Sequence, residues 1–182
     1  MLKEPRPGRV KTRLGQSLGM TQAAWWYRHQ TQSLLRRLRD PRWHLVLAVS
    51  PDCEGQASRV WPADLARIPQ GGGHLGLRML RAMRRFDGRV CLIGSDIPSI
   101  TRGHIAGAFA QLGAEDAVFG PSPDGGYWLI GLKHPGRIAL RSFDGVAWST
   151  PMALAQSKAS LPGKRIGLAA TLQDVDTVDD LP

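Results

Sequence analysis

Short apolar runs that alternate with helical segments constrain the fold of this chain more than any other feature. The run at 43–49 is nearly continuous in apolar side chains, as is typical of a strand buried on both faces of a parallel sheet. Further strands are expected at 89–94 and 116–120, and the apolar run 127–132 follows a turn. A short apolar run by itself fits either a buried strand or part of a helix. The periodicity of the segments between the runs is therefore needed to choose between the two.

Helical periodicity fills the intervals between these runs. The expected helices extend from an N-cap at Thr21 to about Arg39, from about Leu75 to Phe86, and from Thr101 to about Leu112, with a further helix start at 148–151. Strands that alternate with helices predict an α/β fold with a largely parallel sheet. In such sheets ligands bind beyond the carboxyl ends of the strands, so the loops there are candidate functional segments.

The size and charge of the chain limit the classes that remain. A length of 182 residues suits one domain, and we expect a single domain over 1–182. A formal net charge of +9 favours anionic partners, which include nucleic acid and phosphorylated small molecules. Two cysteines suggest neither a disulfide framework nor a cysteine metal site, and no apolar run has the roughly 20 residues that a membrane span needs. A soluble protein of the reduced cytoplasm is therefore expected.

A basic loop near the start of the chain has the chemistry of an anion site. Residues 5–14 read PRPGRVKTRL, in which two prolines stiffen the backbone and Gly8 permits close approach of a ligand; the same stretch carries four cations and a hydroxyl. A helix beginning soon after it would favour phosphate at the same place. The alternative is a basic surface turn that precedes a helix.

Three aspartates are candidate metal ligands. Asp96 follows the second expected strand directly, and a carboxylate there suits Mg²⁺ or Mn²⁺; the alternative is an aspartate that caps a turn. Asp174 and Asp176 are two residues apart, so in extended backbone their side chains point to the same side. The alternative is a polar turn in which Thr177 and Asp180 form a cap-like pair.

Asp124 lies in a Pro-Asp-Gly-Gly-Tyr turn between two apolar runs. The flanking glycines admit a substrate close to the backbone, and the carboxylate could serve as a general base or hold a hydroxyl group. A plain hairpin turn accounts for the same residues. The five histidines show no spacing typical of metal ligands.

Taken together and in order, the segments PRPGRVKTRL, QGGGHLGLRM, GSDIPSI, GPSPDGGYWLIGL, VAWST and DVDTVDDL resemble one bacterial family. This is the glycosyltransferase-A-like (nucleotide-diphospho-sugar transferase) family of unassigned function, domain-of-unknown-function family 2064. More distantly, the chain is similar to guanylyltransferases that act on phospholactate or phosphoenolpyruvate. The resemblance implies a three-layer αβα fold with a mixed, largely parallel sheet, a nucleotide sugar or nucleoside triphosphate as ligand, a small-molecule acceptor, and Mg²⁺ or Mn²⁺.

The resemblance also implies roles for individual residues. Asp96 would be the principal metal ligand, completed by Asp176 and Asp174, and Lys11 and Asp124 would be catalytic. Nucleotide and phosphate binding would involve Pro7, Gly8, Lys11, Thr12, Arg13, Gly72 and Gly73. Acceptor binding would involve Asp124, Gly125, Gly126, Tyr127, Trp148, Ser149 and Thr150.

The chain departs from the family pattern in two places. His74 stands where the family leads us to expect an aspartate, and Leu77 where an acidic residue is usual. The family also has a buried first strand before the basic loop, whereas only residues 1–4 precede Pro5. We therefore expect the first strand to be missing, through a misplaced start or a genuine truncation at the N-terminus, with truncation at the C-terminus as an additional alternative.

Four functions remain open from the sequence. The leading hypothesis is a metal-dependent glycosyltransferase, and the second is a nucleotidyltransferase acting on a small phosphorylated acid. A basic nucleic-acid-binding module is favoured only by net charge and arginine-rich helices, so we do not expect nucleic acid as a partner. The last alternative is an inactive relative that keeps the fold.

Overall fold

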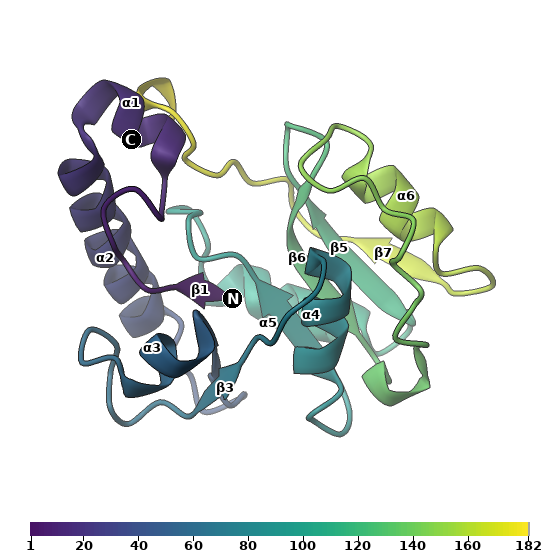
Figure 1. Ribbon diagram of the computed structural model, residues 1–182. Helices are drawn as coiled ribbons and strands as arrows, with labels where there is room; N and C mark the ends of the chain where they lie inside the picture. Colours follow the sequence, from purple (N-terminus) through teal and green to yellow (C-terminus); the bar gives the residue numbers. More distant parts are fainter. Residues whose placement is uncertain (182) are drawn as a thin grey trace. The chain divides into compact units, whose positions relative to one another are not determined.

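The computed structural model describes residues 1–181, which divide into two compact units (Figure 1). Unit 1 comprises Met1–Gln70, Gly94–Arg102 and the chain from Gln173 onward, and unit 2 comprises Gly71–Ile93 and Gly103–Leu172. Because unit 1 is assembled from three separate segments, neither unit is a simple half of the sequence. Each unit is described by itself, and a single domain over 1–182 stays a prediction.

Unit 1 contains a small parallel sheet with helices between its strands. Its strands have the order β1-β2-β3, and all its pairings are parallel. In chain order its elements are β1 (Leu2–Lys3), α1 (Thr12–Leu18), α2 (Met20–Arg37), β2 (Leu47–Ser50), α3 (Asp52–Ala57), β3 (Arg67–Pro69) and the 3₁₀ helix η2 (Val178–Asp180).

The first strand is present in short form, which corrects the expectation that it is missing. Leu2 of β1 lies opposite Val49 of β2 in parallel register. The buried side-chain amide of Gln70 donates hydrogen bonds to the carbonyl oxygens of Leu2, at 2.9 Å, and Ala48, at 2.7 Å. This amide bridges β1 and β2 and so supports a strand of only two residues.

Helix α2 covers a hydrophobic cluster that includes strand residues. The cluster contains Leu2, Val10, Ala24, Tyr27, Leu35, Leu47, Val49 and Trp61. Its helical members recur at spacings that place them on one side of α2. Strand β2 begins at Leu47, not at the predicted residue 43, because the chain is still turning there: the Trp43 indole N–H donates to the Leu38 carbonyl oxygen at 2.9 Å.

Unit 2 contains a mixed four-stranded sheet with the order β4-β6-β5-β7. β6 pairs antiparallel with β4 and β5, and β7 pairs parallel with β5. Its elements are α4 (Leu75–Met83), β4 (Val90–Ile93), α5 (Arg102–Gln111), β5 (Ala117–Pro121), β6 (Tyr127–Leu132), the 3₁₀ helix η1 (Pro135–Arg137), α6 (Ala153–Ala159) and β7 (Ile166–Leu168). The Asp124 turn closes the β5–β6 hairpin, in which Pro121 lies opposite Tyr127.

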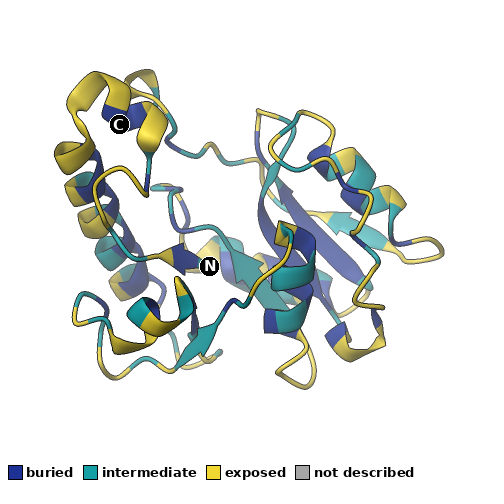
Figure 2. Ribbon diagram, viewed as in Figure 1, coloured by how far each residue is buried: buried dark blue, intermediate teal, exposed yellow. Residues whose placement is uncertain are grey.

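The strands β5 and β6 form the centre of unit 2, and Figure 2 shows them buried over most of their length. Within residues 1–181, three of the five strand pairings are parallel, which confirms an α/β fold with mixed, largely parallel strands. Among the same residues, none of the helices combines the length and apolar character needed to cross a lipid bilayer. A cytoplasmic location stays a prediction.

Candidate functional site

The basic loop between β1 and α1 ends in an unusual backbone conformation at Lys11. This residue is the N-cap of α1 and has φ 46° and ψ 49°, in the left-handed region. For a residue with a side chain this conformation costs about 1–2 kcal/mol, and such strain is concentrated at functional sites. Lysine is almost never buried unless it is paired, yet the Lys11 side chain is only 7% exposed.

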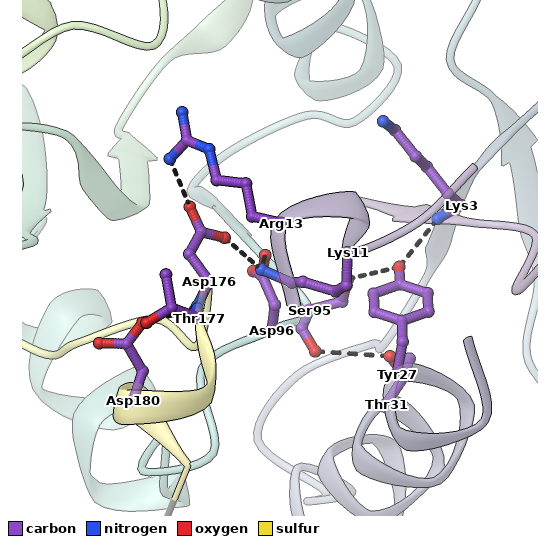
Figure 3. A network of polar contacts seen from close by, with 10 residues as sticks. All are labelled: Lys3, Lys11, Arg13, Tyr27, Thr31, Ser95, Asp96, Asp176, Thr177 and Asp180. Carbon is purple, nitrogen blue, oxygen red and sulfur yellow. Dashed lines mark hydrogen bonds and ion pairs between the residues drawn. The ribbon is translucent and has the colours of Figure 1, made fainter. Parts of the chain in front are cut away.

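Two aspartates surround the Lys11 ammonium group (Figure 3). Its Nζ lies 2.5 Å from Asp96 Oδ2 and 2.7 Å from Asp176 Oδ1. Burial disfavours the charged form, but the two carboxylates more than offset it, so the pKa of Lys11 is raised above its usual value. Lys11 is therefore a cation at neutral pH, held in place by residues far away in the sequence.

A buried hydrogen-bond network positions the loop that carries Asp96. The Tyr27 hydroxyl lies 2.8 Å from Ser95 Oγ, and it accepts a hydrogen bond from the Lys3 backbone N–H at 3.0 Å (Figure 3). Burial raises the pKa of Tyr27, so the phenol stays protonated. This role of Tyr27 was not predicted, although a tyrosine with a polar Thr31 four residues later on the buried side of a helix is a signal for such a network.

The closing segment reaches Asp96 through a backbone contact at Val175. The Val175 N–H donates to the Asp96 carbonyl oxygen at 3.1 Å, and its side chain is buried against Leu14 and Ala23. With Val175 turned inward, the aspartates on either side of it, Asp174 and Asp176, face Asp96. One carboxylate oxygen from each of the three aspartates lies within 4.8 Å of the others.

Both interpretations of the closing segment hold at once. Thr177 and Asp180 form a capping box at the start of η2, with the Thr177 backbone N–H donating to Asp180 Oδ2 at 2.8 Å (Figure 3). Asp180 also accepts from the Asp176 backbone N–H at 3.1 Å. The polar turn therefore fixes the backbone of Asp176, while the Asp176 side chain remains part of the carboxylate cluster.

The donor set fits a small divalent cation. Mg²⁺ takes oxygen ligands at about 2.1 Å, so its ligand atoms lie at most about 4.2 Å apart, and the three aspartates each offer an oxygen within 4.8 Å of the others. Burial and the neighbouring charges of Asp176 and Asp96 raise the pKa of Asp174. A cation at this position would relieve the repulsion that causes this shift.

The outer cations of the basic loop pair with a second acidic group, Glu54 of α3. Arg6 Nε lies 2.9 Å from Glu54 Oε2, and Arg9 NH1 lies 3.9 Å from Glu54 Oε1. Arg13 NH1 lies 3.3 Å from Asp176 Oδ2. Each of the four cations between Pro5 and Leu14 thus faces a carboxylate. Sequence reasoning missed Glu54, because nothing in its local pattern points to the loop.

Pro7, Gly8 and Thr12, the other predicted phosphate-binding residues of the loop, are exposed to solvent. Gly8 has φ 73°, a conformation that favours glycine, and open space surrounds the position where a side chain would begin. The backbone can therefore be approached at this point. Its binding role stays a prediction.

The glycine-rich turn of unit 2 is held by local contacts. The carbonyl oxygen of Gly72 accepts from Arg81 NH1 at 2.9 Å, and Gly73 has φ 98°. His74, which replaces the expected aspartate, caps α4 by accepting the Leu77 N–H at its Nδ1, while its Nε2 lies 3.0 Å from Asp144 Oδ1. His74 therefore performs the capping that an aspartate would perform. The nucleotide contacts of Gly72 and Gly73 stay predictions.

Asp124 is exposed and folds back on its own turn. Its Oδ1 accepts the Gly126 backbone N–H at 2.9 Å, which makes it a turn-forming residue as the alternative interpretation had it. Gly125 has φ 83° and packs against the backbone of Pro151. The catalytic role of Asp124 is a separate prediction, which this contact neither requires nor excludes.

The other predicted acceptor residues lie near the β5–β6 hairpin and before α6. The rings of Tyr127 and Trp148 are 6.4 Å apart in an edge-to-face arrangement, and the Tyr127 hydroxyl lies 3.2 Å from Ser157 Oγ. Ser149 has φ 60°, and the Thr150 hydroxyl donates to the Ala147 carbonyl oxygen at 2.8 Å. Helix α6 begins at Ala153, not at the predicted 148–151, because these residues form a turn.

The chain is similar to proteins of one bacterial family. A family model described as "Uncharacterized protein conserved in bacteria (DUF2064)" matches residues 34–150. A crystal structure from Desulfovibrio desulfuricans G20, of a protein provisionally named a nucleotide-diphospho-sugar transferase, is 33% identical. It has a TM-score of 0.83, and the match covers 97% of this chain and 80% of the other. No curated protein matches.

Two further structures share the fold at lower identity. A homologue of Mycobacterium tuberculosis rv0371c from Mycobacterium sp. strain JC1 is 16% identical with a TM-score of 0.54, over 83% of this chain and 77% of the other. The 4-diphosphocytidyl-2C-methyl-D-erythritol synthase of Anaerococcus prevotii DSM 20548 is 9% identical with a TM-score of 0.57, over 85% and 82%. At these identities the likeness concerns the fold alone.

Proposed function

The chain belongs to the bacterial family DUF2064, and on that premise we propose that it is a metal-dependent transferase that uses a nucleotide-activated donor. The form we favour is a glycosyltransferase that moves a sugar from a nucleotide sugar to a small-molecule acceptor. The observation that carries the proposal is the clustering of Asp96, Asp174 and Asp176, two of which, Asp96 and Asp176, pair with the Lys11 ammonium group of the basic loop.

Asp96, Asp174 and Asp176 would hold Mg²⁺ or Mn²⁺, and Asp96 would be the principal ligand. Bound there, the ion would neutralise negative charge on the phosphates of the donor and of the leaving group. Tyr27 helps to position Asp96, because its hydroxyl pairs with Ser95, the residue that precedes Asp96. Second-layer contacts of this kind commonly change metal affinity by about 10- to 100-fold.

Lys11 and Arg13 would bind the phosphate groups of the donor. In glycosyl transfer the leaving group is a nucleoside diphosphate, on which negative charge increases as the sugar departs. Cations already positioned for that charge stabilise the transition state more than the ground state. Pro7, Gly8 and Thr12 would line the same phosphates, since they are exposed on the same loop.

For unit 2 we propose nucleotide contacts at Gly72 and Gly73 and acceptor contacts at the hairpin turn. Asp124 would take a proton from the acceptor hydroxyl as a general base, with Gly125 and Gly126 allowing close approach. Tyr127 and Trp148 would provide ring surface, and Ser149 and Thr150 hydrogen-bonding groups. The ring centroids of Tyr127 and Trp148 lie 6.4 Å apart, which supports a common role for these two residues.

The second candidate is a nucleotidyltransferase acting on a small phosphorylated acid. The fold likeness to a diphosphocytidyl-methylerythritol synthase favours it. The leaving group would then be pyrophosphate, and the loop cations and the carboxylates would have the same tasks. The carboxylates and cations gathered in unit 1 favour an active transferase over an inactive relative that keeps the fold.

Thermal unfolding with a panel of nucleotides and nucleotide sugars, each with and without Mn²⁺, tests these proposals. A ligand that binds the folded state raises the unfolding temperature according to its concentration and affinity. Stabilisation by a nucleotide sugar that requires Mn²⁺ supports glycosyl transfer. Stabilisation by GTP or CTP, with pyrophosphate release on adding a phosphorylated acid, supports nucleotidyl transfer. No response to any nucleotide contradicts both.

A further inference from the structure

The Lys11 ammonium group lies between two of the three carboxylates that would hold the metal ion. Its Nζ contacts one oxygen of Asp96 at 2.5 Å and one of Asp176 at 2.7 Å, as Figure 3 shows. Asp174, the third member of the cluster, has a carboxylate oxygen within 4.8 Å of the other two. The Lys11 ammonium group is therefore paired with carboxylate oxygens that a divalent cation would need as ligands.

The surroundings of Lys11 leave it little room to share this position. Its side chain is 7% exposed, so the ammonium group cannot exchange its carboxylate partners for bulk water without leaving. Arg13 is different: it contacts only Asp176, at 3.3 Å, and its side chain is 70% exposed. Of the two, Lys11 alone is fixed between two of the metal-binding carboxylates.

We infer, on the basis of the proposed function, that Lys11 and the divalent metal exclude each other at the Asp96–Asp176 carboxylates. Lys11 is thus an internal competitor that keeps metal affinity low until a phosphate group draws its ammonium away. The metal and the phosphate groups of the donor then bind interdependently, because each removes an obstacle to the other.

The chemistry of lysine suits this exchange. Its ammonium group is a compact charge on a flexible four-carbon stem, and it pairs equally well with carboxylate and phosphate oxygens. When it moves to a phosphate, Asp96 loses its cationic partner and Asp176 retains only the exposed Arg13, so the pair of carboxylates favours another cation. By linkage, a phosphate group that raises the affinity for metal must be bound more tightly by the same factor when metal is present.

Mn²⁺ binding without nucleotide, followed by the electron paramagnetic resonance signal of free Mn²⁺, tests the exchange directly. The variant Lys11→Met removes the charge and keeps much of the stem volume. We expect it to bind Mn²⁺ roughly ten- to hundredfold more tightly than the wild-type protein, the usual range of coupling between sites. Inorganic phosphate should increase Mn²⁺ affinity in the wild-type protein and leave that of Lys11→Met unchanged.

Two control variants separate charge from structure. Lys11→Arg keeps a cation beside the carboxylates and should bind Mn²⁺ as weakly as the wild-type protein. Arg13→Met removes an exposed cation that contacts only Asp176, so the affinity should rise by no more than about threefold. Circular dichroism of each variant shows whether it folds, and Lys11→Gln replaces Lys11→Met if the latter does not.

The results distinguish the exchange from the metal site itself. If the wild-type protein binds Mn²⁺ in a manner that Asp96→Asn removes, but folded Lys11→Met binds it no more tightly, the exchange is wrong and the proposed metal site stands. If neither the wild-type protein nor any Lys11 variant binds Mn²⁺, the proposed metal-dependent function fails and the exchange fails with it.

Discussion

The two units organise their predicted functional residues in different ways. In unit 1, Lys11 meets Asp96 and Asp176 from positions far apart, 165 residues apart for Lys11 and Asp176. In unit 2, Asp124 bonds to Gly126 two residues away, and Thr150 bonds to Ala147 three residues away. The first set depends on tertiary structure, whereas the second is held by turn geometry.

This difference has an energetic side. Unit 1 gathers like charges into one place, and the raised pKa of Asp174 records the cost of burying and crowding them. Asp124 and Thr150 of unit 2 make ordinary turn hydrogen bonds. Like charges held close together are typical of functional sites. Variants in unit 1 should therefore separate effects on function from effects on stability more clearly than variants in unit 2.

The largest expected effect is on metal binding. Asp96→Asn removes the principal ligand charge and should abolish Mn²⁺ binding, whereas Asp124→Asn should leave Mn²⁺ affinity as it is in the wild-type protein and lower turnover only. Isothermal titration with Mn²⁺ measures the affinities. A metal response that survives Asp96→Asn would contradict the assignment of the site to unit 1.

The next effect concerns stability in unit 2. Gly125 has φ 83°, and a Cβ atom there would lie 2.2 Å from the Pro151 carbonyl oxygen, so Gly125→Ala should lower the free energy of unfolding by about 3 kcal/mol. Gly145→Ala is the matched control in the same unit, because open space surrounds that position. Urea unfolding measures both. Equal stability of the two variants would show that the hairpin turn is less tightly fixed than this geometry requires.

A smaller effect compares the two tyrosines of the chain, one in each unit. The Tyr27 hydroxyl pairs with the buried Ser95 and accepts from the Lys3 N–H, so Tyr27→Phe removes both hydrogen bonds and should cost about 2 kcal/mol. Tyr127→Phe loses one contact, to Ser157, and should cost about 1 kcal/mol or less. Urea unfolding again gives the free energies. Tyr27→Phe should also weaken Mn²⁺ binding, an effect that Tyr127→Phe should lack.

The smallest effect is a gain in stability that depends on pH. Because the folded state raises the pKa of Asp174 above its ordinary 3.8, its favourable contribution is complete below pH 3.8 and is lost as pH rises through the raised pKa. Asp174→Asn should therefore stabilise the metal-free protein slightly at pH 7 and not at pH 3. Thermal unfolding at both pH values measures the difference. A variant that is less stable than the wild-type protein at pH 7 would contradict the assigned sign.

Local chemistry in the sequence determined several features correctly. The predicted run 127–132 has the same bounds as strand β6, whose apolar side chains are almost all buried in the sheet. The Asp-Gly-Gly turn closes the hairpin because glycine can adopt φ 83° without strain. Alternation places Asp174 and Asp176 on one side and buries Val175 on the other. Each of these follows from interactions within a few residues.

Tertiary structure alone decided the contacts that join distant segments. No local pattern predicts that Tyr27 pairs with Ser95, 68 residues away, or that Glu54 faces Arg6. Nor does the sequence say that β1 survives as two residues bridged to β2 by Gln70. The charges of the basic loop and of the aspartates can be read directly from the sequence. The Lys11 side chain lies between Asp96 and Asp176 because packing brings the basic loop, the Asp96 loop and the closing segment together. The sequence does not show this, since Coulomb attraction and burial depend on distances in space and not on separation along the chain.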